Sequence, residues 1–451
     1  MFPFITAALS LLLIVAMLFV FRRWEGKSEL ILKCMTVAFC LLGLFRLLLA
    51  DGFVETVFNF EHPLETLLRW GYWIGYAVLP MAVFTDSRLF RNIAAYFSAP
   101  ISLLSILFMN TTMAHFFDGQ GYGFTLTPAL RYIFYILELI LALSIPVLTS
   151  IRRKHKIDIK NYEELFNLTL GLPAVLLQMM PVYVPQALVG YSNIPYDYFF
   201  APFHLAWILF IITECVILYL YFRHRTEKDK YHLLLFLVIA QLFHTMSIFL
   251  RGFTLSRMPI QLCSIAAFFY FFTVVFKSRK LFGFCFLTNI VGALVAIFLA
   301  AFDVGALSFW TLHYMYEHTF VMLMPVLALS LGVFPRLTRS DLVPAIGIFS
   351  IYFLGCFGSG MIINSITGKF TVNYFYMFNL EVALEYVPFA SFTGAIELAI
   401  GTLKVYPLLI LVIYTVFVLL ITGLYALMQG IYRLSDWIRH KREERFLVRT
   451  R

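Results

Sequence analysis

Residues 281–301 have the sequence LFGFCFLTNIVGALVAIFLAA, a run of 21 residues without a charged side chain. A helix of about 20 apolar residues is long enough to cross the hydrocarbon core of a bilayer. Similar runs recur along the chain and are separated by short charged loops. Hydrophobic residues make up 61% of the chain and charged residues only 13%, about half the share found in a soluble domain. The sequence therefore predicts an all-α, polytopic helical membrane protein without a separate soluble domain.

Thirteen membrane-spanning helices are predicted from these runs. Loops after the odd-numbered spans, and the C-terminal tail, are rich in Lys and Arg, whereas loops after the even-numbered spans carry mainly Asp and Glu. Because Lys and Arg concentrate on the cytoplasmic side of cell membranes, we expect the N-terminus outside and the C-terminus in the cytoplasm. The predicted spans are 4–21, 30–50, 66–86, 91–109, 129–151, 164–185, 203–222, 231–250, 259–276, 281–301, 309–334, 342–363 and 405–432.

The net charge of +9 indicates contact with anionic phospholipids of the inner leaflet. Nucleic acid is not an expected partner, because the chain has no basic folded domain. No cofactor and no metal is predicted, since the six cysteines all fall within apolar spans and show no metal-ligand spacing. These cysteines are Cys34, Cys40, Cys215, Cys263, Cys285 and Cys356.

Short stretches repeat in the same order along the two halves of the chain, which indicates two parallel six-helix units followed by a thirteenth helix. The predicted domains are a first, degenerate unit over 1–195, a second unit over 196–370, and a final part over 371–451. That final part comprises an outer-face lid or re-entrant segment, the last helix and the basic tail. The matching stretches are 21–27 with 222–228, 87–90 with 278–282, and 130–132 with 312–314.

Cys263 and His313 are the residues most suggestive of chemistry, and both belong to the predicted second unit. Each lies about four residues inside a span that runs from the outer face inward, so both are expected roughly 6 Å below that face. The first unit has Arg131 in place of His313 and no thiol in place of Cys263.

A thiol becomes a strong nucleophile when a neighbouring imidazole removes its proton. A thioester on Cys263, with His313 as the base, would divide acyl transfer between lipids into two easier steps. Glu317 shares a helical face with His313 and is the predicted group that orients it. The alternative is a packed polar network of His313, Glu317 and His318 that only fixes helix positions.

A resemblance follows from Pro259 with Cys263, from His313-Tyr314 two spans later, and from Asn373-Tyr374. These motifs resemble the YwaF-type bacterial membrane proteins, which are similar to a eukaryotic TMEM-family acyltransferase that remodels ether phospholipids and, more distantly, to androgen-induced membrane hydrolases. The resemblance covers roughly residues 203–380 and implies that Cys263 and His313 are the catalytic pair. One departure is Gln261, where the family often has His.

Residues that would bind a phospholipid substrate are predicted around this pair. Arg251 is suited to a lipid phosphate, although anchoring to headgroups is the alternative role. Gln261, Asn289 or Tyr314 would stabilise an oxyanion. His318 and Asn373 complete the predicted substrate-binding set.

The function predicted from the sequence is a lipid acyltransferase or lipid-ester hydrolase near the outer membrane face. Two alternatives remain open, a transporter or lipid-translocating protein and a non-catalytic membrane scaffold. Residues 364–404 are predicted to form a lid on the outer face or, equally, a helix on the headgroups.

Overall fold

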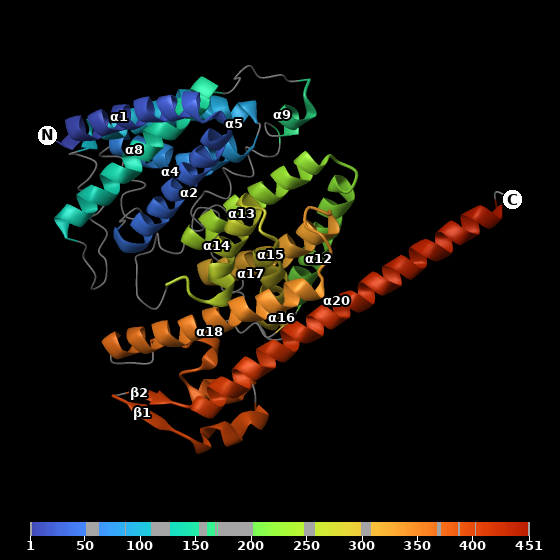
Figure 1. Cartoon of the computed structure of the whole chain (residues 1–451). Helices are drawn as coiled ribbons and strands as arrows, with labels where there is room; N and C mark the ends of the chain where they lie inside the picture. Colours follow the sequence, from blue (N-terminus) through green and yellow to red (C-terminus); the bar gives the residue numbers. More distant parts are fainter. Residues whose placement is uncertain are drawn as a thin grey trace. The chain divides into compact units, whose positions relative to one another are not determined.

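A computed structural model confirms the predicted all-α class in the part of the chain that it describes (Figure 1). A single short hairpin interrupts the helices there, in which β1 (Leu398–Ile400) pairs antiparallel with β2 (Leu403–Val405). The structure describes residues 2–50, 63–85, 87–109, 127–152, 160–166, 169, 202–247, 258–298, 308–367, 371–386, 388–401 and 403–449.

The helices belong to two compact units. The first unit takes in 1–195, 226–258 and 304–314. In it, α8 packs against α1, α2 and α6, with Tyr135, Leu139 and Ile145 fully buried. Its described helices are α1 (Phe2–Arg23), α2 (Glu25–Ala50), α4 (Pro63–Phe84), α5 (Arg88–Ile93), η1 (Ala94–Ser98), α6 (Ala99–Leu107), α8 (Pro128–Arg152), α9 (Tyr162–Phe166), α13 (Glu227–Ser247) and the start of α17 (Phe309–Ser330).

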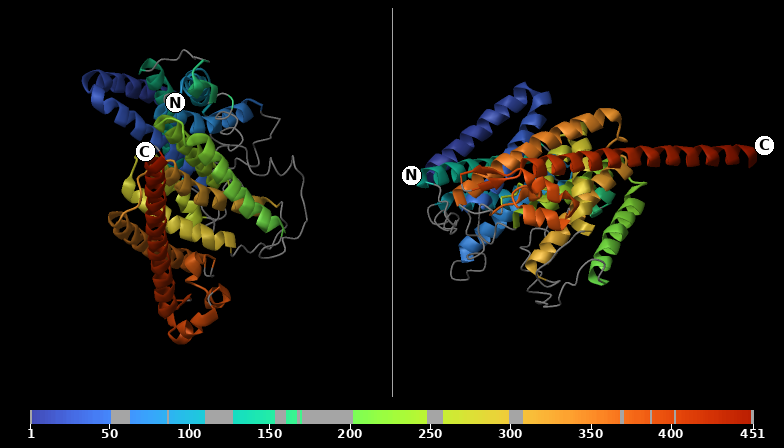
Figure 2. Two further views of the ribbon diagram at one scale, coloured as in Figure 1. Left: turned by 90° about the vertical axis from the view of Figure 1, so that its right-hand side faces the viewer. Right: turned by 90° about the horizontal axis from the view of Figure 1, so that it is seen from below.

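The second unit takes in 196–225, 259–303 and 315–451. Its longest helix is α20 (Pro407–Arg449), which Figure 2 shows extending far beyond the helices that it packs against in this unit. The remaining described elements are α12 (Pro202–Phe222), α14 (Leu262–Val275), α15 (Arg279–Phe284), η5 (Cys285–Asn289), α16 (Ile290–Phe298), the rest of α17, α18 (Arg339–Thr367), η6 (Tyr374–Tyr376), α19 (Leu380–Tyr386), η7 (Pro388–Ala395), β1 and β2.

Seven helices in the described residues are long and apolar enough to cross a membrane. The predicted count of thirteen crossings, grouped into two six-helix units, is not supported. Helix α14, for example, has 14 residues, which corresponds to about 21 Å and falls short of the hydrocarbon core. The predicted span 164–185 lies mostly outside the described residues. The seven helices are Phe2–Arg23, Arg88–Leu107, Tyr132–Ile151, Pro202–Phe222, Arg279–Phe298, Arg339–Thr367 and Pro407–Lys441.

One local structure nevertheless occurs in both units. A six-residue α-helix, a five-residue π-helix and a nine-residue α-helix follow one another in α5–η1–α6 and again in α15–η5–α16. Both begin with a serine N-cap, Ser87 accepting from the Phe90 N–H and Ser278 from the Leu281 N–H, each at 3.4 Å. Because π-helices are rare, the occurrence of the same α–π–α succession in α5–η1–α6 and α15–η5–α16 supports a local repeat.

Helices α8 and α17 extend this local repeat. Each contains a proline inside the helix, Pro146 in α8 and Pro325 in α17. A buried glutamate precedes each proline by eight residues, Glu138 in the first case and Glu317 in the second. A glutamate buried at the same helical position therefore occurs in both copies.

The prolines also fix the register of the two helices. When the two prolines are aligned in sequence, Tyr135 matches Tyr314, so both helices have a tyrosine at this position. In this alignment Phe134, and not the predicted Arg131, matches His313. The first copy thus has an apolar ring, and no cation, where the second has an imidazole.

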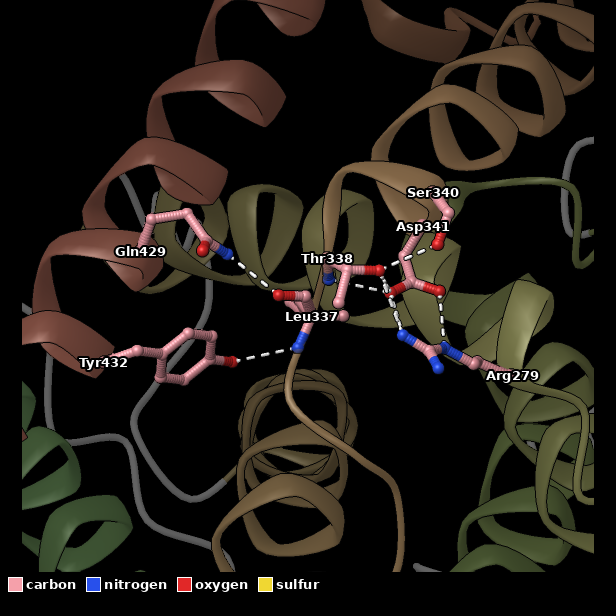
Figure 3. Close-up of polar contacts among 7 residues, drawn as sticks. All are labelled: Arg279, Leu337, Thr338, Ser340, Asp341, Gln429 and Tyr432. Carbon is pink, nitrogen blue, oxygen red and sulfur yellow. Dashed lines mark hydrogen bonds and ion pairs between the residues drawn. The ribbon is translucent and has the colours of Figure 1, made fainter. Parts of the chain in front are cut away.

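A polar cluster at one end of the second unit joins α15, α18 and α20 (Figure 3). The buried Asp341 carboxylate accepts two hydrogen bonds from the Arg279 guanidinium, both at 2.8 Å, and further ones from the Thr338 N–H and hydroxyl. The chain just before α18 is held from the other side, because Gln429 donates to the Leu337 carbonyl and Tyr432 accepts from the Leu337 N–H.

We expect Asp341→Ala to lower the free energy of unfolding by about 2 kcal/mol, because it removes hydrogen bonds to a charged group at a buried position. Asp436→Ala is the matched control. It breaks the ion pair of Asp436 with Arg336, whose side chains are 60% and 50% exposed, and exposed pairs contribute little. The measurement is the thermal unfolding midpoint in detergent. Equal midpoints for the two variants would contradict the expectation.

Candidate functional site

Cys263 is the second residue of α14 and lies two positions after the N-cap residue Gln261. Cys263 as a residue is partly exposed, and the backbone N–H groups of Cys263 and Ser264 interact with its sulfur. The first turn of a helix has N–H groups without intrahelical partners and carries the positive end of the helix dipole. Both features favour a thiolate, but burial and the neighbouring Glu317 carboxyl group outweigh them and raise the pKa of the Cys263 thiol well above its usual value.

The carboxyl group of Glu317, on α17, interacts electrostatically with the Cys263 thiol. Glu317 is only 4% exposed. The second unit therefore brings two of the three predicted catalytic residues together, although they lie on different helices.

Helix α18 supplies the other side of this region. The Tyr352 hydroxyl donates a hydrogen bond to the Ile260 carbonyl, and the Cys356 sulfur donates to the same oxygen at 3.7 Å. Tyr352 also interacts electrostatically with Cys263. These contacts anchor the chain just before α14 and place the Tyr352 hydroxyl near the Cys263 thiol.

Tyr374 contributes a further hydroxyl from η6. It is 2% exposed, interacts with Tyr352 and Cys356, and its hydroxyl has no hydrogen-bond partner among the described residues. The turn that presents it is strained, because Phe375 has φ 53° and Tyr376 φ 60°. We refer to Cys263, Glu317, Tyr352, Cys356 and Tyr374 as the thiol cluster.

Asn373 has a structural role in this turn. Its side-chain oxygen accepts from the Phe378 N–H at 2.9 Å. The preceding residue, Val372, is held by Asn364, whose amide donates to the Val372 carbonyl and accepts from its N–H at 3.0 and 2.9 Å. The predicted part of Asn373 in substrate binding stays a prediction.

His313 lies in the first unit, where it stacks on His244 of α13. Their ring centroids are 4.5 Å apart with planes at 21°, and His244 Nε2 lies 3.3 Å from the His313 carbonyl oxygen. Both rings are buried. Cys263 belongs to the other unit, so the predicted contact between Cys263 and His313 stays a prediction.

Gln241 lies one turn before His244 on the same face of α13. Its side chain is fully buried, and neither its amide nitrogen nor its amide oxygen has a hydrogen-bond partner in the described part of the chain. Buried amides without partners are rare. Gln241 is therefore a buried amide next to His244 that has no hydrogen-bond partner in the described part of the chain.

The other predicted site residues are dispersed. Asn289 ends the π-helix η5 and is fully buried beside Tyr270, whose hydroxyl donates to the Val321 carbonyl at 2.8 Å. His318 is buried on α17, and Tyr314 is partly exposed. Gln261 is exposed and makes no side-chain cap, while Arg251 lies outside the described residues.

The sequence analysis gave no role at the site to Gln241, His244, Tyr352, Cys356 and Tyr374, although Tyr374 belongs to the Asn373-Tyr374 motif. A signal existed for the first two, since a glutamine and a histidine three residues apart in an apolar span are as costly as the polar residues noted in 309–334. Tyr352 and Cys356 are four apart and share a helical face, but tyrosine and cysteine are common packing residues in apolar helices. In the described residues, no group of three or more His, Cys, Asp or Glu side chains is placed to hold a metal ion.

These features define a multi-pass helical membrane protein with a thiol-centred polar cluster in its second unit. Residues 199–425, just over half of the chain, match the TMEM164 family. The chain belongs to this family. Neither a curated protein nor a solved structure matches it.

We expect Gln241→Leu to raise the free energy of unfolding by about 1 kcal/mol, because it removes two buried polar atoms that lack partners. His244→Leu is the comparison, since it also removes the ring stacked on His313 and is expected to destabilise. Thermal unfolding in detergent without added lipid measures both. A lower midpoint for Gln241→Leu would show that the amide is already satisfied in the free protein.

Proposed function

We propose that this TMEM164-family protein is a membrane acyltransferase or lipid-ester hydrolase that uses Cys263 as its nucleophile. The observation that carries the proposal is the thiol cluster, in which a partly exposed cysteine at a helix N-terminus has a buried carboxyl group and tyrosine hydroxyls as neighbours. The resemblance to YwaF-type proteins and to the TMEM-family ether-phospholipid acyltransferase agrees with this assignment. The proposed substrates are membrane phospholipids.

The proposed reaction has two steps. In the first, the Cys263 thiolate attacks the carbonyl carbon of a lipid ester, the ester C–O bond breaks, and the leaving alcohol takes up the proton that the thiol lost. In the second, the hydroxyl of an acceptor lipid, or water, attacks the thioester and returns a proton to the sulfur. A site shielded from water favours transfer over hydrolysis.

His313 is the proposed base. Two roles are considered for Glu317, orienting the His313 imidazole or acting directly on the Cys263 thiol. As an orienter, it would hold the imidazole one helical turn away. As a carboxylate, Glu317 raises the pKa of the Cys263 thiol, so its alternative role would be to take up the thiol proton itself and become neutral. A buried glutamate also occurs at the matching position of α8, where the neighbouring residue is Phe134. Orienting a histidine is therefore not the only role of a glutamate at this position.

Two kinds of donor are suited to the oxyanion. The backbone N–H groups at the start of α14 already interact with the sulfur, and the buried Tyr374 hydroxyl is without a partner among the described residues. Tyr374 replaces Gln261 as our preferred side-chain donor, because Gln261 is exposed. Asn289 and Tyr314 stay as predicted alternatives.

A lipid-translocating protein is the second candidate. The recurring three-part helix and the buried Glu138 and Glu317 favour it, because internal repeats are typical of transporters. Lipid flux in proteoliposomes that is unchanged in Cys263→Ala would support translocation. We retain the predicted orientation, with the N-terminus outside and the basic tail in the cytoplasm, as part of the proposal.

A phospholipid with a fluorescent acyl chain is expected to label the wild-type protein through a thioester that hydroxylamine cleaves. Cys263→Ala should abolish the label. Cys356→Ala, which removes a neighbouring thiol of the same cluster, is the matched control and should keep it. The readout is in-gel fluorescence with and without hydroxylamine, together with the cellular phospholipid acyl profile.

The same assay identifies the base. His313→Gln is expected to slow labelling strongly, and Glu317→Gln less so. Normal labelling in His313→Gln with loss in Glu317→Gln would reject His313 and assign proton removal to the carboxyl group. Labelling that persists in Cys263→Ala would reject the whole proposal.

Tyr374→Phe is expected to reduce the rate of thioester formation by roughly 10²–10³-fold, the usual effect of removing one oxyanion donor. Binding of the lipid should be nearly unchanged, since the ring stays. Single-turnover labelling measures the rate. Tyr376→Phe, at an exposed neighbour in the same turn, is the control and should behave as wild type.

A further inference from the structure

The segment between α18 and α20 contains a strained turn whose two ends are fixed. Phe375 and Tyr376 have φ of 53° and 60°, and bulky residues rarely adopt such values unless the surrounding structure imposes them. Before the turn, the N–H and the carbonyl of Val372 are both hydrogen-bonded. After it, the Phe378 ring stacks on Phe357 with centroids 5.8 Å apart and planes at 3°. The strain is therefore confined to the middle of the turn.

The Phe375 ring lies among four other aromatic rings, which we call the aromatic cage. Three of these rings belong to α18 and one to α20, and all four centroids lie within the usual range for edge-to-face and tilted contacts. The distances from the Phe375 centroid are 6.0 Å to Phe349, 5.9 Å to Tyr352, 5.2 Å to Phe353 and 5.0 Å to Phe417. These ring contacts hold the strained turn in place.

The walls of the aromatic cage are more deeply buried than the side chain that fills it. Phe349, Tyr352 and Phe353 are buried, whereas Phe375 is only partly buried. Phe375 therefore fills the cage from its exposed side.

Tyr352 connects the aromatic cage to the thiol cluster. Its ring is part of the cage, and its hydroxyl donates to the carbonyl of Ile260, three residues before Cys263. Tyr374, the residue before Phe375, also belongs to the thiol cluster. An acyl chain attached to the Cys263 sulfur needs an apolar site nearby, and such sites are lined mainly by aromatic and aliphatic side chains. The aromatic cage has this composition and shares a residue with the thiol cluster.

We propose that the aromatic cage is the binding site for an acyl chain of the phospholipid substrate, and that Phe375 competes with the chain for this site. The inference rests on the proposed function, which supplies the acyl chain. The chain replaces the apolar contacts of the Phe375 ring, and withdrawal of the ring releases the strain at Phe375 and Tyr376. Because the two occupants exclude each other, the apparent affinity for lipid depends on the fraction of molecules in which the ring has left the cage.

Photo-cross-linking in the full chain with Cys263→Ala tests the site without the reaction. The probe is a phosphatidylcholine with a diazirine in one acyl chain, added to the protein in detergent, and mass spectrometry identifies the labelled residues. Residues of the aromatic cage are expected to be labelled. Adding Phe375→Ala should raise this labelling roughly tenfold at a limiting probe concentration, because the competing ring is removed.

Phe378→Ala is the matched control. It removes a buried ring of the same segment that stacks on Phe357 and lies outside the aromatic cage. The cage should then be labelled as in Cys263→Ala alone. Equal labelling in the Phe375→Ala and Phe378→Ala proteins, or labelling that avoids the cage, overturns the proposal.

Tyr376→Gly tests the strain by a change in the opposite direction. Glycine adopts a φ of 60° at little cost, so the state with Phe375 in the cage becomes more stable relative to the lipid-bound state. Labelling of the cage should fall severalfold, while the thermal unfolding midpoint without probe stays at or above that of Cys263→Ala alone. Unchanged or increased labelling, or a lower midpoint, overturns the proposal.

The acyl-chain site and the proposed reaction fail separately. Labelling of the aromatic cage without a thioester on Cys263 in the wild type rejects the reaction and keeps the site. A thioester on Cys263 without labelling of the cage keeps the reaction and rejects the site.

Discussion

Polar groups enclosed by apolar helices must find partners, and this requirement shapes both units of the protein. Many hydroxyls along the helices bond to their own backbone, as Thr6 does to the Phe2 carbonyl and Thr36 to the Leu32 carbonyl. Others connect helices, as Tyr270 does with Val321. Because water is excluded from the hydrocarbon, each such bond replaces one that water would otherwise supply.

The same requirement makes the exceptions informative. Most buried groups are satisfied. The Gln241 amide and the Tyr374 hydroxyl have no hydrogen-bond partners among the described residues, and the same holds for the hydroxyls of Ser98, Ser105, Ser144 and Thr288. Groups of this kind occur where a ligand, water or reacting atom completes the site. Tyr374 lies in the thiol cluster, and Gln241 lies beside the histidine pair. Each of the two residues proposed to react, Cys263 and His313, thus has in its cluster a buried polar group without a hydrogen-bond partner among the described residues.

The sequence predicted much of the helical framework and part of the site. The apolar run 203–222 corresponds to α12 over Pro202–Phe222, because length and hydropathy together define a span. The position of Cys263 near the start of its helix was approximately predicted, because the sequence placed it about four residues inside a span and the structure has it as the second residue of α14. The predicted count of thirteen crossings is not supported by the described residues, in which an apolar run can form a buried helix as well as a membrane-spanning one. The partners of Cys263 were incompletely predicted, since Tyr352, Cys356 and Tyr374 come from distant helices.

The sequence by itself determined that this chain is a helical membrane protein, because composition and run length control partitioning into lipid. It also singled out Cys263, His313 and Glu317, because their side chains are unusual in apolar helices. Only the tertiary structure decided which groups meet, bringing Glu317 and Tyr352 to Cys263 and stacking His244 on His313. Helical periodicity predicts on which face of its own helix a side chain lies. The packing between helices decides which side chains of another helix it contacts.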